Sequence, residues 1–92
     1  MELPFLTTFT TVYETGNVTR AAAELHRSQP TVSYQLRRLE EAMGQPLFLR
    51  RASRVMATPL ADRLYRLARG FARDVAVLRE GGPDAGAPTG LE

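Results

Sequence analysis

Side chains of the kinds that hydrogen-bond nucleic-acid bases cluster between residues 29 and 34 of this chain. The amide of a glutamine can pair with both hydrogen-bonding groups on the edge of adenine, and hydroxyl groups can bond bases or phosphates. Proline and the threonine methyl group can contact thymine methyl groups, and a tyrosine can meet a methyl group or a phosphate. The candidates for contact with base pairs are therefore Gln29, Pro30, Thr31, Ser33 and Tyr34.

The basic residues also point to a polyanionic partner. All twelve are arginine, and ten of them lie between Arg20 and Arg69, where there are four acidic residues. The forked donors of a guanidinium group match phosphate and guanine. The alternative is a solvated surface in which arginine replaces lysine through the codon bias of a GC-rich organism. Candidates for contact with phosphates or a narrow minor groove are Arg20, Arg37, Arg38, Arg50, Ser53 and Arg54.

The chain lacks the residues that disulfides, metal sites and common catalytic sites require. The chain has no cysteine and a single histidine, His26, which excludes disulfides, thiolate metal ligands and cysteine nucleophiles. It has no catalytic serine–histidine–aspartate set and no glycine-rich phosphate loop. Glu40 and Glu41 diverge on a predicted helix and are expected on a solvated face. We therefore expect neither an enzyme nor a bound metal or cofactor.

The apolar residues do not suggest a membrane protein. No apolar run approaches the roughly 18 residues of a membrane-spanning helix. The N-terminus lacks the basic region of a secretory signal. We therefore expect a cytoplasmic protein without membrane contact.

Three helices are predicted in the first half of the chain, over residues 4–15, 18–25 and 29–43, from apolar residues at helical spacing. Asn17 and Ser28 are favourable N-caps for the second and third helices. Gly16 and Gly44 favour the ends of the first and third, because glycine accepts the left-handed conformation found there.

The third helix is predicted to have one buried side, formed by Val32, Leu36 and Leu39. Its opening turns would then project polar groups away from the core, and Gln35 is expected among them. The free N–H groups at its start favour a phosphate.

The second half predicts a hairpin within residues 47–57 and a long helix over residues 59–80. Two short runs suited to β-strands flank a small polar turn, and Thr58 followed by Pro59 indicates a helix start. We expect a DNA-binding domain at residues 1–58, a linker or dimerisation helix at 59–80, and a flexible tail at 81–92.

The long helix carries an apolar stripe that extends beyond what a small domain can cover. A partner helix from a second copy is the favoured interpretation. The candidates for dimerisation are Leu64, Tyr65, Leu67, Ala68, Phe71, Ala72, Val75 and Leu78.

A short helix, a three-residue turn and a longer helix form the helix-turn-helix arrangement, and the hairpin would be its wing. Residues 17–40, which include the run Ser28-Gln29-Pro30-x-x-Ser33-x-Gln35, closely resemble the DNA-binding domain of LysR-type transcriptional regulators. The pattern Leu47-Phe48-x-Arg50 and the start of the last helix at Thr58 resemble it too. The similarity extends from residue 1 to about residue 80.

The resemblance implies a mainly α, winged helix-turn-helix fold that binds duplex DNA. The five candidates named above for contact with base pairs would read the major groove, while Arg50, Ser53 and Arg54 would contact the flanks. Two copies would pair through the last helix and bind an inverted-repeat operator as a homodimer. In a longer protein, tetramers could form. A small-molecule effector would bind only to a further domain that is absent here.

The sequence departs from the family at three positions. Ala52 and Ala61 stand where the family often has glycine, and Tyr34 stands where it often has a basic residue.

Two other functions are compatible with the sequence. A helical protein–protein interaction module would use the arginines only for solubility. An isolated repressor or anti-activator would act without an effector domain.

Overall fold

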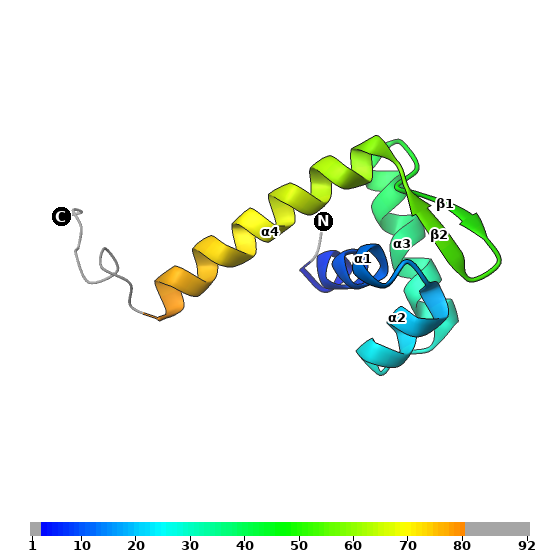
Figure 1. Ribbon diagram of the computed structural model, residues 1–92, viewed down its shortest axis with the longest axis horizontal. Helices are drawn as coiled ribbons and strands as arrows, with labels where there is room; N and C mark the ends of the chain where they lie inside the picture. The colour runs from blue at the N-terminus through cyan, green and yellow to red at the C-terminus, as the bar shows by residue number, and fades with distance from the viewer. Residues whose placement is uncertain (1–2, 81–92) are drawn as a thin grey trace.

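The computed structural model describes residues 3–80, which form four helices and one hairpin (Figure 1). The prediction of a mainly helical fold with a hairpin and a long last helix is confirmed, and no predicted helix boundary differs by more than one residue. The predicted tail, residues 81–92, lies outside the described residues. In chain order the elements are α1 (Leu3–Thr15), α2 (Val18–Leu25), α3 (Gln29–Met43), β1 (Phe48–Arg51), β2 (Arg54–Ala57) and α4 (Pro59–Arg79).

The hydrophobic core lies where α1, α2 and α3 meet, and the hairpin and the start of α4 close it. The small side chains of Ala21 and Ala22 let neighbouring helices approach α2 closely. The ring of Phe9 lies 5.5 Å from that of Phe48, between centroids, and so joins α1 to β1. The buried apolar residues are Phe9, Val12, Val18, Ala21, Ala22, Val32, Leu36, Leu39, Leu47, Phe48, Ala61 and Leu64.

The helix ends follow the caps expected from the sequence. The side chains of Asn17, Ser28 and Thr58 accept hydrogen bonds from the backbone N–H groups of Arg20, Thr31 and Ala61. Gly16 and Gly44 adopt left-handed conformations, with φ of 68° and 75°. His26 ends α2 in the same conformation, with φ of 56°, which the sequence did not identify because positive φ is uncommon for any residue other than glycine.

The hairpin is attached to the helices along one side. Its strands are antiparallel and pair Phe48 with Ala57 and Arg51 with Arg54. At the tip, Val18 N–H donates to the Ser53 carbonyl at 2.8 Å, and Val55 N–H donates to the Gly16 carbonyl at 3.1 Å. Two backbone bonds therefore hold the hairpin against the turn between α1 and α2.

Ala52 in the hairpin turn has a φ of 57°, in the left-handed region that is unfavourable for residues other than glycine. This is one of the positions where the resembling family often has glycine. The departure noted in the sequence therefore corresponds to local backbone strain.

The last helix begins in the core and then leaves it. Ala61 and Leu64 are buried against the other elements, so the first two turns of α4 complete the domain, and we call residues 3–64 the head. Beyond them α4 passes α1 and continues away from the head (Figure 1). Among residues 3–80, no helix has the length and apolar character needed to cross a membrane.

Candidate nucleic-acid interface

The opening turns of α3 present polar groups on the surface of the head. Val32, Leu36 and Leu39 are buried, which fixes the opposite side of the helix toward solvent. Ser33 is half-buried. The other four candidate residues in this range are exposed, and Tyr34 keeps 51% of its surface accessible.

The hairpin and α3 meet through a side-chain contact. Arg50 Nη1 donates to Ser33 Oγ at 3.0 Å, which joins β1 to the opening half of α3. The Ser33 hydroxyl hydrogen is not used in this bond, so the group can still donate to a base or a phosphate. Two candidates from separate parts of the sequence thus form one surface.

A second polar contact ties the hairpin tip to α2. The hydroxyl groups of Thr19 and Ser53 lie 2.8 Å apart, and Asn17 forms a backbone bridge with Arg54. Because Arg20 lies in the first turn of α2 and is exposed, the tip brings Arg20, Ser53 and Arg54 into one region. The sequence did not indicate this contact of Thr19.

Most of the candidate arginines carry uncompensated charge. Within residues 3–80 the one ion pair joins Arg38 to Glu41 at 3.2 Å, and it is exposed and therefore weak. The guanidinium groups of Arg20, Arg50 and Arg54 have no carboxylate partner in this part of the chain. Their charge is available to an external anion.

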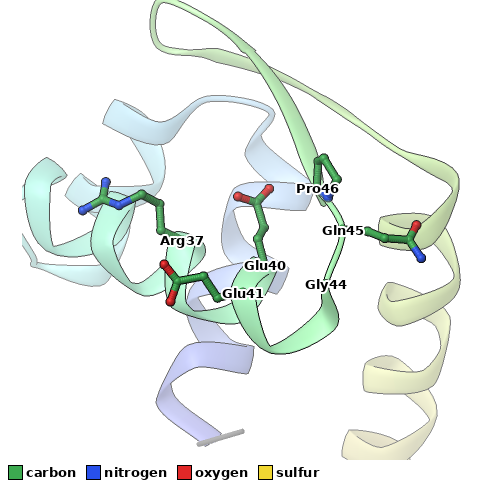
Figure 2. Close-up of a pocket in the computed structure, with 6 residues that line it drawn as sticks. All are labelled: Arg37, Glu40, Glu41, Gly44, Gln45 and Pro46. Atoms are coloured by element: carbon green, nitrogen blue, oxygen red, sulfur yellow. The ribbon is translucent and has the colours of Figure 1, made fainter.

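Glu40 differs from the expectation of a solvated carboxylate. Its Oε2 accepts from the backbone N–H groups of Leu47 and Phe48, at 2.7 and 3.1 Å. Figure 2 shows its side chain directed toward the segment that enters β1, whereas Arg37 and Glu41 lie on the outer side of α3. The expectation was wrong for Glu40 because its partners are backbone groups distant in sequence, and the bonds position the start of the hairpin.

Gln35 also differs from the expectation, since its side chain is directed inward. Its Oε1 accepts from Thr8 Oγ1 and from Arg27 Nη1, the latter at 3.0 Å. Arg27 Nη1 also donates to Thr8 Oγ1 at 2.7 Å, and Thr8 is fully buried. This network of Thr8, Arg27 and Gln35 joins α1, the turn and α3 behind the exposed residues.

The dimerisation candidates divide into two groups. Leu64 is buried in the head, and Tyr65 stacks on Tyr13 of α1, so Leu64 belongs to the head and Tyr65 packs directly on it. The remaining six, called the pairing face below, lie further along α4, where part of this face lines a groove with Leu6 and Thr10 of α1. Within that face Leu67, Phe71 and Leu78 remain 72%, 54% and 66% exposed. The pairing face consists of Leu67, Ala68, Phe71, Ala72, Val75 and Leu78.

Comparison with known proteins shows that the chain is similar to bacterial transcriptional regulators. Residues 3–62 match the sequence profile described as "Bacterial regulatory helix-turn-helix protein, lysR family". The chain is 44% identical over 84 residues to the HTH-type transcriptional regulator AbaB of Streptomyces antibioticus. That match covers 91% of this chain and 28% of AbaB, so the chain spans little more than a quarter of the length of this relative.

Two solved structures with bound DNA have a similar fold. The BenM_DBD/catB site 1 DNA complex gives a TM-score of 0.80 at 34% identity, covering 87% of this chain and 90% of that one. The CbnR_DBD–DNA complex gives 0.79 at 32% identity, covering 88% and 91%. The chain is thus similar to DNA-binding domains over most of its length.

The network behind α3 yields a stability prediction. Thr8→Val keeps the branched shape of the side chain but removes the hydroxyl group that Arg27 and Gln35 contact. Because these two groups would lose a partner in a part-buried site, we expect the free energy of unfolding to fall by about 1–3 kcal/mol in urea denaturation.

Thr11→Val on the same helix is the matched control. Its hydroxyl group donates to the Thr7 carbonyl in an exposed position, so its removal should change the free energy of unfolding by less than about 0.5 kcal/mol. Equal losses from the two variants would contradict the role assigned to the network.

Proposed function

Because the chain belongs to the lysR family of bacterial regulatory helix-turn-helix proteins and is a LysR-type DNA-binding domain, we propose that two copies bind an inverted-repeat operator together. Helix α3 of each copy enters the major groove, and the hairpin contacts the flanking backbone or minor groove. The single observation that carries this proposal is the division of α3 into a buried apolar side and an exposed polar opening.

The proposed contacts to bases come from the start of α3. The side chain of Gln29 has no hydrogen-bond partner among the described residues, so both groups of its amide are free for an adenine edge. Pro30 and Thr31 supply methyl and methylene groups to thymine, while Ser33 and Tyr34 can bond bases or phosphates. The start of the helix adds free N–H groups that favour a phosphate.

The proposed contacts to the backbone surround this set. Arg20, Ser53 and Arg54 lie together where the hairpin tip meets α2. Arg50 lies beside Ser33, between the two surfaces. Arg37 and Arg38 are exposed further along α3 and would bind phosphates at the edge of the groove.

The homodimer is proposed from the pairing face of α4. Three large apolar side chains of this face are more than half exposed, and an apolar helical stripe of this kind favours burial against a partner. A second copy of the same helix supplies a matching stripe under two-fold symmetry. Pairing would then fix the separation of the two heads and so of the two half-sites.

Effector binding and tetramer formation are proposed for a longer protein that contains this domain. Because the chain covers 28% of AbaB, we propose that a further domain binds a small-molecule effector and allows tetramers to form. Action on the bacterial nucleoid follows from binding to operator DNA.

Gln29→Ala tests the proposed reading of bases. A duplex chosen by binding-site selection from a random library would be compared with a random duplex in fluorescence-anisotropy titrations. We expect the affinity for the selected duplex to fall by about 1–3 kcal/mol, with non-specific affinity nearly unchanged.

Gln45→Ala is the control, because Gln45 is an equally exposed glutamine beyond the end of α3 and should alter neither affinity. If Gln29→Ala weakened both duplexes equally, Gln29 would be a contact to the backbone and not to a base.

Phe71→Asp tests the pairing face. A carboxylate at this position would need to be desolvated in the dimer, so we expect monomers in sedimentation velocity. Val77→Asp is the matched control, since Val77 is also exposed but lies about 120° away from Phe71 around the helix at 3.6 residues per turn. A dimer that persists in Phe71→Asp, or monomers in both variants, would refute this face.

A further inference from the structure

The junction between the head and α4 contains two stacked tyrosines. Tyr13 lies near the end of α1, and Tyr65 lies in the second turn of α4. Their ring centroids are 4.1 Å apart and their planes differ by 10°. A stacked contact of this kind restricts both the distance between the helices and the rotation of α4 about its axis.

The two hydroxyl groups bond in opposite directions across the same junction. Tyr13 Oη donates to Asp62 Oδ1 on α4 at 2.7 Å, and Tyr65 Oη donates to Glu14 Oε2 on α1 at 2.6 Å. The bond to Asp62 raises the pKa of Tyr13, and the bond to Glu14 raises the pKa of Tyr65. The shift adds to the ordinary preference of a tyrosine for the protonated form, so both hydroxyl groups are donors at neutral pH.

Together, Tyr13, Glu14, Asp62 and Tyr65 form what we call the tyrosine clamp. Its two hydrogen bonds join α1 to α4, one in each direction. Leu64 and Ala61 pack in the core beside it, but apolar packing is not directional. The clamp adds directional contacts at the point where α4 leaves the head.

The direction of α4 matters because the helix acts as a lever. Val75, in the far half of the pairing face, lies ten residues beyond Tyr65, or about 15 Å along the helix at 1.5 Å per residue. A tilt of about 10° at the clamp would displace it by ~3 Å, close to one base-pair step along DNA. A small change at the junction would therefore change the separation of two paired heads by about a base pair.

We propose that the tyrosine clamp determines half-site spacing, with Tyr13 and Tyr65 as positioning residues that fix the angle between the DNA-reading head and the pairing helix. This inference rests on the proposed homodimer. It requires that neither tyrosine contact DNA, so their removal should leave the affinity of a single head unchanged.

The test measures affinity as a function of spacing. Two copies of the selected half-site would be placed in duplexes whose central spacer varies in single base pairs, and a duplex with one half-site would be titrated in parallel. The wild-type chain should favour one spacing. In Tyr65→Leu, which removes both the stack and the bond to Glu14, we expect the preference for that spacing over its neighbours to fall roughly tenfold.

Conservative variants separate the parts of the clamp. Tyr65→Phe keeps the stacked ring and should lose only part of the preference. Glu14→Gln keeps an acceptor for Tyr65 and should retain the wild-type profile, whereas Glu14→Leu should broaden it. Because Glu14 is exposed, these two variants keep the test valid even if Tyr65→Leu fails to fold.

A control is needed to show that a less stable head does not by itself broaden the preference for spacing. Leu25→Ala is the control, because Leu25 packs on the core from α2, away from the clamp, and should lower the free energy of unfolding without altering the preferred spacing. Affinity for the single half-site should remain close to that of the wild type in the clamp variants, since the proposal places neither tyrosine in contact with DNA.

Three results would overturn the proposal. A sharp wild-type profile in both Tyr65→Leu and Glu14→Leu would show that the clamp does not set the spacing. An equal loss on single and paired half-sites would assign the tyrosines to the head itself. If the wild-type chain bound paired half-sites no more tightly than a single one, the proposed homodimer would be refuted. That result would be measured on the wild-type chain, before any clamp variant is made.

Discussion

Burial of Val32, Leu36 and Leu39 along one side of α3 is the constraint on which the rest of the structure depends. Once that side faces the core, the helix cannot rotate, and its other side must face solvent. Ser28 determines where the helix begins, because its side chain accepts the Thr31 N–H. Core packing therefore sets the direction of the exposed residues, and a single cap sets which of them come first.

Polar contacts then hold the surfaces on either side of α3 in place. The carboxylate of Glu40 bonds the backbone that enters β1, and Ser53 ties the hairpin tip to α2 through Thr19. Behind the helix, Arg27 and Gln35 bond the buried Thr8. The head thus presents a preorganised surface, which lowers the ordering cost that binding would otherwise carry.

The sequence predicted the elements better than the contacts between them. Helical periodicity and caps at Asn17, Ser28 and Thr58 are local signals, and they located every helix. Gln35 and Glu40 were placed incorrectly because the partners of Gln35 lie 27 and 8 residues away and those of Glu40 lie 7 and 8 residues away, and no local pattern reveals such pairs. Tyr65 belongs to the apolar stripe of α4 by spacing, but its stack on Tyr13 depends on how α4 crosses α1.

If the exposed arginines and the opening of α3 bind duplex DNA as proposed, affinity should depend steeply on salt concentration. If about 6–10 phosphates are neutralised, affinity for the selected duplex should fall by roughly 10³–10⁵ between 50 and 200 mM salt, with a linear dependence of log K on log salt. Failure to bind duplex DNA even at low salt would contradict the account and favour a protein–protein interaction module whose arginines only keep it soluble.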